Sequence, residues 1–269
     1  MCELFAMSSR VPADVKFSLE AFSRRGGLEG PHKDGWGIAW YEEEDVRLVK
    51  EPYPAADSAC VRFIQEHPFS AAIVLSHIRR ATQGLVALKN CQPFARELGG
   101  RMHVFAHNGN LDVQELRASM PLDGFHPVGD TDSEYAFCAL LGRLREPWLR
   151  GGLPDLEERS GIVARFAAAI RPLGPANFLY SDGDALFVHG HRRMHEPGSP
   201  PRPPGLHVVC RRCVAQSGAV DADGLSVALE ADQEVVLAAS VPLTGEPGWR
   251  SLAEGELVVA RQGRIVGTD

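Results

Sequence analysis

The sequence lacks several features that would place it in a broad class of protein. It has no run of about 18 apolar residues, the length that a membrane-spanning helix needs. Its first residues, MCELFAMSSR, have no basic region followed by a long apolar stretch, so they do not form a secretory signal. Positive charge is not in excess, since the net charge is −7, whereas general nucleic-acid binders carry a basic surface. We therefore expect a cytoplasmic protein that binds neither membranes nor nucleic acid.

Motifs for disulfides, metals and ATP are also scarce. Without a secretion signal, the 6 cysteines of the 269-residue chain are expected to be reduced. Cys210 and Cys213 form a CxxC pair, but no second pair completes a zinc site, so we interpret both as small apolar residues of a strand. The sequence contains no GxxxxGK[ST] motif for nucleotide phosphates. We expect neither a metal ion nor an organic cofactor.

Other basic residues and histidines receive structural interpretations. The neighbours Arg192 and Arg193 are interpreted as a solvated pair. His103 and His107 are four residues apart on a predicted strand, so both side chains point to one face, where packing is the favoured role. Histidines without paired metal-ligand spacing are interpreted as surface or strand-end residues: His67, His189, His191 and His195.

Apolar patterns predict a mixed order of strands and helices. Strands and hairpins are predicted at residues 35–41, 46–50, 71–77, 102–107, 177–181, 185–189, 206–216, 234–241 and 257–266. Helices are predicted at residues 15–25 after an Asp14 cap, 58–66, 133–145 and 156–170. This order indicates an α+β layered fold. The proline-rich segment 197–204 is interpreted as a loop, because too few residues follow it for a second domain.

Cys2 could carry two reactive groups, a thiol and an α-amine. Removal of Met1, which we expect, would leave Cys2 with a thiol and a free α-amine. An α-amine titrates near 7.7–8.0, so it can accept the thiol proton during attack and return it to a leaving amine. The position alone is weak evidence, because an incidental N-terminal residue is the simpler interpretation.

Four further segments bear on Cys2, and each has an ordinary structural interpretation. Residues 76–84, SHIRRATQG, place Arg79 just past a buried-type strand, where basic turn residues are common. Residues 107–109, HNG, form an ordinary turn by themselves. Residues 131–134, TDSE, open a helix and are typical of a cap. Residues 34–37, DGWG, begin a strand in which glycines permit tight packing.

Together and in this order, the segments resemble the class II glutamine amidotransferases, the N-terminal-nucleophile hydrolases that work through an N-terminal cysteine. The motifs cover residues 2–140, and a looser likeness reaches the end of the chain at residues 238–243, Trp249 and 255–257. The resemblance implies a four-layer αββα sandwich of the N-terminal-nucleophile hydrolase type. It also implies one amidotransferase domain over residues 2–269, with Met1 removed.

The resemblance also assigns roles to individual residues. Cys2 is the nucleophile, and the Asn108 amide and Gly109 N–H form the oxyanion hole. Arg79 matches the arginine that binds the α-carboxylate of glutamine, and Asp132 matches the residue that receives its α-ammonium group. The remaining substrate-binding set comprises Gly35, Trp36, Thr82 and His107. Arg80 stands where some relatives carry an aromatic residue, which distinguishes the loop of residues 81–84 from theirs.

The implied reaction is attack of Cys2 on the γ-amide of glutamine or a γ-glutamyl compound, which releases ammonia or an amine and then glutamate. Three hypotheses follow for the chain. It is a stand-alone hydrolase of a γ-glutamyl amide, an ammonia-donating subunit for a separate synthase, or a binding protein that performs no turnover. The leaving-group side of the pocket is assigned to residues 118–130 and 190–205.

Overall fold

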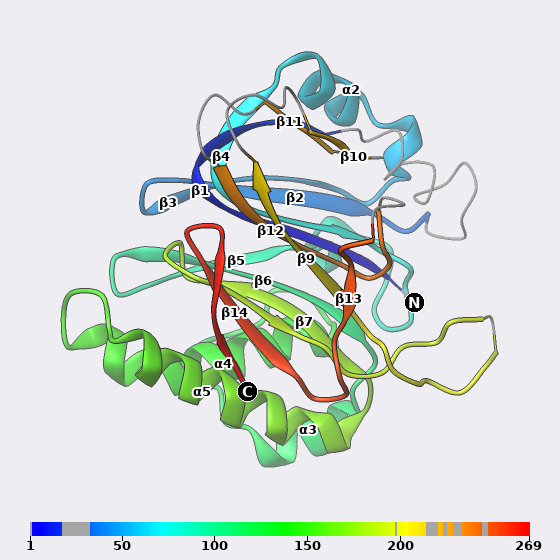
Figure 1. Ribbon diagram of the computed structural model, residues 1–269. Helices are drawn as coiled ribbons and strands as arrows, with labels where there is room; N and C mark the ends of the chain where they lie inside the picture. The colour runs from blue at the N-terminus through cyan, green and yellow to red at the C-terminus, as the bar shows by residue number, and fades with distance from the viewer. Residues whose placement is uncertain are drawn as a thin grey trace.

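Two antiparallel sheets stack face to face between helices (Figure 1). The computed structural model describes residues 2–17, 33–196, 198–213, 220–222, 225–228, 233–243 and 247–269. Figure 1 shows α2 on the outer side of the first sheet and α3, α4 and α5 on the outer side of the second. The expected four-layer αββα order is confirmed.

The first sheet is built around β1 (Glu3–Phe17), which has pairing partners on both sides. Its main path runs β13-β9-β12-β1-β4-β2-β3, and β11, itself paired with β10, also joins β1. The other strands are β2 (Trp36–Glu42), β3 (Asp45–Glu51), β4 (Phe69–Ile78), β9 (His207–Cys213), β10 (Val220–Ala222), β11 (Leu225–Ala228), β12 (Gln233–Ala239) and β13 (Arg250–Ser251).

The second sheet has the order β15-β14-β8-β7-β6-β5. Its strands are β5 (Phe94–Leu98), β6 (Arg101–Gly109), β7 (Ala176–Ser181), β8 (Leu186–His189), β14 (Leu257–Arg261) and β15 (Arg264–Thr268). Because β6 lies inside this sheet and ends at Gly109, the HNG segment falls at the end of a buried strand.

Side-chain caps begin several of the helices, which are α2 (Ala59–Glu66), α3 (Val113–Ser119), α4 (Asp132–Leu149) and α5 (Leu156–Ile170). The Ser58 hydroxyl accepts a hydrogen bond from Val61 N (3.0 Å) at the start of α2, as predicted. The Thr131 hydroxyl accepts a hydrogen bond from Glu134 N (3.2 Å) at the start of α4. No helix among the described residues is long and apolar enough to cross a membrane.

Strand alternation divides the apolar residues into three cores. On β1, Leu4 and Ala6 face the second sheet, while Phe5 and Met7 face α2. A third core lies between the second sheet and helices α3, α4 and α5, and it includes Phe105, Phe137 and Phe178. The sandwich is therefore filled on both faces of both sheets.

The predicted strands and helices are confirmed over the described residues apart from one helix, and residues 214–216 of the strand predicted at 206–216 lie outside the described residues. Residues 14–17 belong to β1, where Asp14 pairs with Ser70 of β4 and Ala228 of β11, so the helix predicted from Val15 is wrong over these residues. The rest of that prediction, residues 18–25, lies outside the described residues. The sequence reasoning missed β1, β5, β10, β11, β13 and α3, and it ended the helix that begins near Ser133 too early, since α4 runs to Leu149.

Burial corrects the interpretation of one basic residue. Arg193 is buried rather than solvated, whereas its neighbour Arg192 is half-exposed and paired with Glu254. His189 and His191 lie at and just beyond the end of β8, as their interpretation as strand-end residues predicts, and both are buried because β8 is a strand inside the second sheet.

The CxxC segment lies on β9, where Cys210 is exposed rather than buried.

Candidate active site

Antiparallel pairing of β1 with β4 brings Cys2 next to the arginine segment. Glu3, the first residue of β1, pairs with Ile78, the last residue of β4, so Cys2 lies beside Arg79 and Arg80. The Arg80 N–H donates to Cys2 Sγ (3.3 Å), and the thiol lies 3.4 Å from the Arg80 carbonyl oxygen. The two segments are 78 positions apart in the sequence, and the sheet makes them neighbours.

Burial raises the pKa of the Cys2 thiol, an effect that the Arg80 N–H bond and the charge of Arg79 oppose and the charge of Asp132 reinforces. The thiol is therefore protonated at neutral pH and needs a base when it attacks. Cys2 is also partly exposed, so a substrate can reach it.

Asn108 lies near the end of β6 in the second sheet, and its side chain contacts Cys2. Its side-chain Nδ2 donates to the Cys2 carbonyl oxygen (2.6 Å) and lies 3.4 Å from the Ser240 hydroxyl. Its Oδ1 is buried and has no hydrogen-bond partner among the described residues. The structure thus brings Cys2 and Asn108 together, as predicted.

Gly109 is required by packing of the main chain. A Cβ at this position would lie 1.8 Å from the Pro175 carbonyl oxygen and 2.4 Å from His107 Nε2. A side chain here would therefore collide with the protein itself.

Arg79 is a buried cation surrounded by main-chain carbonyl groups. Its guanidinium donates to the carbonyl oxygens of Gln83 (2.9 Å) and Leu85 (3.1 Å), with longer contacts to Gly84 and Asp34. No acidic side chain lies within 4.0 Å of it in the part of the chain that the structure describes. A buried guanidinium without a carboxylate partner is suited to bind the carboxylate of a ligand.

Asp132, the first residue of α4, supplies the opposite charge. Its carboxylate is buried and accepts a hydrogen bond from Leu111 N (2.8 Å), and the Ser133 hydroxyl lies 3.4 Å from its second oxygen. Arg79 and Asp132 both affect the pKa of Cys2, so a cation and an anion lie within electrostatic reach of the thiol. This arrangement suits a zwitterionic amino-acid group.

The loop after Arg79 is fixed by two residues that the sequence reasoning did not assign to the site. The Asp34 carboxylate accepts from Ala81 N (2.8 Å), and Gln83 Nε2 donates to Asn110 Oδ1 (2.6 Å) and to the Leu111 carbonyl (3.1 Å). Asp34 lies in the motif DGWG and Gln83 in the motif SHIRRATQG, so the sequence could have indicated that both belong to the site.

The predicted substrate-binding set is only partly brought together. The Gly35 carbonyl accepts from Arg79 N (2.7 Å), and its φ of +129° and a Cβ position 2.7 Å from Cys91 Sγ exclude a side chain. The Gly35 carbonyl therefore fixes the main chain of Arg79. Thr82 is exposed on the loop that follows Arg79.

Trp36 and His107 do not present their side chains to the site, which corrects the prediction. The Trp36 indole is fully buried in the core beneath α2, and its Nε1 donates to Glu51 (3.2 Å). The His107 ring contacts the Ser133 hydroxyl (2.9 Å) and the Pro175 carbonyl (3.3 Å). Burial lowers the pKa of His107, which favours the neutral ring. Because a carbonyl only accepts, Nε2 carries the proton, and His107 holds the turn rather than the substrate.

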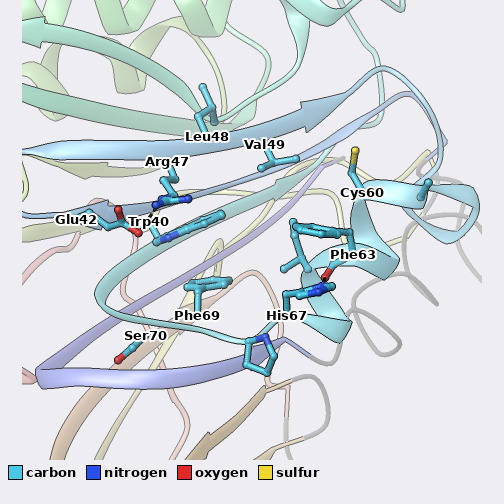
Figure 2. Close-up of a pocket in the computed structure, with 13 residues that line it drawn as sticks. Trp40, Glu42, Arg47, Leu48, Val49, Cys60, Phe63, His67, Phe69 and Ser70 are labelled. Carbon is cyan, nitrogen blue, oxygen red and sulfur yellow. Dashed lines mark hydrogen bonds and ion pairs between the residues drawn. The ribbon is translucent and has the colours of Figure 1, made fainter.

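A hollow of about 890 Å³ lies on another face, between the β2–β3 hairpin and α2 (Figure 2). Trp40 stacks on Phe69 in its wall, with 4.1 Å between ring centroids, and Phe63 and His67 line the helix side. None of the candidate catalytic residues lines this hollow. Across the described residues, no group of three or more His, Cys, Asp or Glu side chains is placed to hold a metal ion.

Comparison with known proteins agrees with this arrangement. YafJ of Escherichia coli (strain K12), a glutamine amidotransferase candidate, is 36% identical over 261 residues, which span 95% of this chain and 96% of YafJ. The 2.0 Å crystal structure of a predicted glutamine amidotransferase from Pseudomonas aeruginosa PA01 has a TM-score of 0.71 and 34% identity, and the match covers 99% of this chain and 100% of that one.

A more distant structure shares the fold. The glutamine phosphoribosylpyrophosphate amidotransferase of Bacillus subtilis has a TM-score of 0.63 at 15% identity, and the match covers 100% of this chain and 49% of that one. The sequence profile described as "Glutamine amidotransferases class-II" matches residues 1–269. With this match and the relatives of similar length, the chain belongs to the class II glutamine amidotransferases.

Proposed function

We propose that this chain is a stand-alone amidohydrolase that cleaves the γ-amide of glutamine or of a γ-glutamyl compound. The observation that carries the proposal is the position of Cys2, whose carbonyl group contacts Asn108 and whose thiol lies within electrostatic reach of the buried charges of Arg79 and Asp132. Arg79 binds the α-carboxylate and Asp132 binds the α-ammonium group, which leaves the γ-amide to approach Cys2.

The proposed reaction has two stages. After removal of Met1, the α-amine of Cys2 accepts the thiol proton as Sγ bonds to the amide carbon. Asn108 and the Gly109 N–H stabilise the oxyanion. The tetrahedral intermediate collapses, the C–N bond breaks, and the leaving amine takes the proton from the α-ammonium group. Water then attacks the γ-glutamyl thioester, gives its proton to the α-amine, and releases glutamate as the thiol is restored.

Glutamate release tests this proposal. Protein shown by intact mass to have lost Met1 is incubated with glutamine and a panel of γ-glutamyl amides, alongside a Cys2→Ala variant. We expect glutamate from at least one substrate with the parent chain and none with the variant. Equal release from both proteins, or none from either, would refute hydrolysis at Cys2. Retention of Met1 on active protein would refute the role of the α-amine, and its retention on inactive protein would favour a binding protein without turnover.

A second candidate function, ammonia supply to a separate synthase, is favoured by the surface beside Arg79. The carbonyls of Gln83 to Leu85 point inward to the guanidinium, while the side chains of Leu85, Val86 and Leu88 are more than half exposed. Apolar residues gathered on one loop are typical of a contact surface. Glutamate release that rises when a co-purified synthetase is added would support this function, and Val86→Glu should abolish the rise without changing the basal rate.

We also propose a cytoplasmic location. Fractionation of cells that carry a tagged copy tests it, with the tag expected in the cytoplasmic fraction.

A further inference from the structure

Arg193 lies far from Cys2 in the sequence but next to it in the fold. It comes from the connection between β8 and β9 and bridges to Arg202 through two main-chain hydrogen bonds (3.0 and 2.9 Å). Its guanidinium donates to the Glu3 carboxylate (2.9 Å) and to the Ser240 carbonyl (2.6 Å). Arg193 is 7% exposed and Glu3 is 8% exposed, so a nearly buried ion pair adjoins the nucleophile.

Ser240 connects this ion pair to the main chain around Cys2. Its hydroxyl accepts from Leu4 N (2.9 Å), and its own N–H donates to the Leu4 carbonyl (3.0 Å). The same hydroxyl lies 3.4 Å from Asn108 Nδ2, which also contacts the Cys2 carbonyl. Glu3, Leu4 and the oxyanion-hole amide are therefore joined through Ser240 and Arg193.

These contacts lie where the strand pairing ends. On the β4 side, the pairing of β1 continues to Glu3, but on the β12 side it stops at Phe5, which pairs with Ala239. Residues 2–4 thus have no β12 partner in the strand ladder. Ser240 and Arg193 take its place on that side.

The connection between β8 and β9 also supports Asn108 from behind. Asn177 Nδ2 donates to the Asn108 carbonyl (2.9 Å) and to the Arg192 carbonyl (2.7 Å), and Asn177 Oδ1 accepts from His191 N (2.7 Å). Residues 191–193 therefore contact both sides of the candidate site, the nucleophile strand through Arg193 and the oxyanion-hole strand through Asn177.

We propose that Arg193 is a positioning residue, which acts through Glu3 and Ser240 to hold Cys2 against Asn108. This inference rests on the proposed function of Cys2 as nucleophile. Arg193 does not contact Arg79 or Asp132 in the described residues, so its loss should leave substrate binding largely intact. A displaced nucleophile slows the chemical step, and a shift of about 1 Å can cost about 100-fold in rate.

Kinetics of Arg193→Met, Glu3→Gln and the double variant test the inference. We expect kcat to fall about 10- to 100-fold in Arg193→Met with KM within about twofold, and to fall less in Glu3→Gln, which keeps a hydrogen-bond acceptor. The double variant leaves no unpaired buried charge, so its melting temperature should recover while its kcat stays low. Recovery of kcat together with the melting temperature would overturn the positioning role.

A matched control separates positioning from general destabilisation. Arg159 is another buried arginine, paired with Asp182 and Asp184 on the helical side of the second sheet. Arg159→Met should lower the melting temperature but leave kcat near that of the parent chain. An equal loss of kcat in this control would overturn the inference.

Alkylation of Cys2 by iodoacetamide distinguishes failure of this inference from failure of the proposed function, because it requires no turnover. In Arg193→Met, the partly exposed Cys2 should become more accessible and label several-fold faster, while buried Cys138, followed by peptide mass spectrometry, labels at an unchanged rate. If Cys2 labels faster but even the parent chain releases no glutamate, the function fails and the positioning role stands. Equal labelling of Cys2 in both proteins overturns the positioning role.

Discussion

At the scale of single residues, Arg79 is the feature with the clearest chemical consequence. A buried guanidinium is costly unless it is paired, and here only carbonyl dipoles face it among the described residues. Two of its four carbonyl contacts are long, at 3.3 and 3.4 Å, and none of the four supplies a negative charge. A ligand carboxylate would supply that missing charge in a geometry that matches the planar guanidinium.

Substitution of Arg79 by lysine should therefore weaken substrate binding. A lysine ammonium keeps the charge but cannot make two parallel hydrogen bonds to a carboxylate. We expect KM for glutamine to rise about 10- to 100-fold in Arg79→Lys, with a smaller change in kcat. Steady-state glutamate release measures both, and Arg47→Lys, an exposed pair with Glu42 far from Cys2, serves as the control. An unchanged KM would show that Arg79 does not bind the substrate.

Gly109 offers a second test at this scale. The added methyl group of Gly109→Ala meets the Pro175 carbonyl at 1.8 Å, so the end of β6 must move. Such overpacking costs about 1–3 kcal/mol of stability, and displacement of the oxyanion-hole N–H should lower kcat about 100-fold or more. The control is Gly267→Ala on β15, whose nearest neighbour would lie at an ordinary 3.7 Å. Denaturant titration and steady-state kinetics should separate the two variants; if they behave alike, the geometry at Gly109 is wrong.

At the scale of elements, the features predicted correctly from sequence depend on residues near one another in the chain, and those missed depend on contacts between distant segments. Helix α5 was predicted with the bounds that the structure has, and the Ser58 cap was predicted correctly, because both depend on nearby residues. The extension of β1 over Asp14 depends on β4 and β11, strands that follow it at a distance in the sequence. Arg193 was misread for the same reason, since its partner Glu3 lies 190 positions away.

His103, one of the two buried histidines of β6, should make the stability of the protein depend on pH. His103 contacts the Tyr180 hydroxyl (2.7 Å) and the Leu98 carbonyl (3.1 Å), and burial lowers its pKa to about 4. Above the unfolded pKa of about 6.5, both states are neutral and its contribution to stability is complete. As the pH falls below 6.5, the unfolded state binds a proton first, so stability decreases until about pH 4.

The size of this effect follows from the pKa difference, at about 1.4 kcal/mol per unit, so His103 should contribute about 3 kcal/mol of the loss. Urea unfolding at pH 7, 5.5 and 4.5 measures the slope. In His103→Gln the slope should be smaller, although the variant is less stable at every pH. Parallel slopes for the two proteins would show that His103 does not titrate in this way.

At the scale of the whole molecule, the candidate site joins both sheets and one helix. The first sheet supplies Cys2 and Arg79, the second supplies Asn108 and Gly109, and α4 supplies Asp132. The order of the motifs made the family recognisable from sequence, but the sequence did not indicate which side chains face inward. Trp36 and His107 belong to the matched motifs yet pack into the interior, because strand alternation and the approach of Pro175 decide their direction.

A ligand that spans Arg79 and Asp132 should consequently stabilise the sandwich as a unit. In Cys2→Ala, which cannot turn over the substrate, glutamine at about 100 times Kd should add about 2.7 kcal/mol to the free energy of unfolding. For a chain of this size, that corresponds to a rise of about 5–10 °C in melting temperature. Differential scanning fluorimetry measures the rise, and Cys2→Ala/Asp132→Asn should lose most of it, because the neutral amide no longer pairs with the α-ammonium group. An equal rise in both variants would place glutamine elsewhere, since binding at this site requires the negative charge of Asp132 opposite the ammonium end of the ligand.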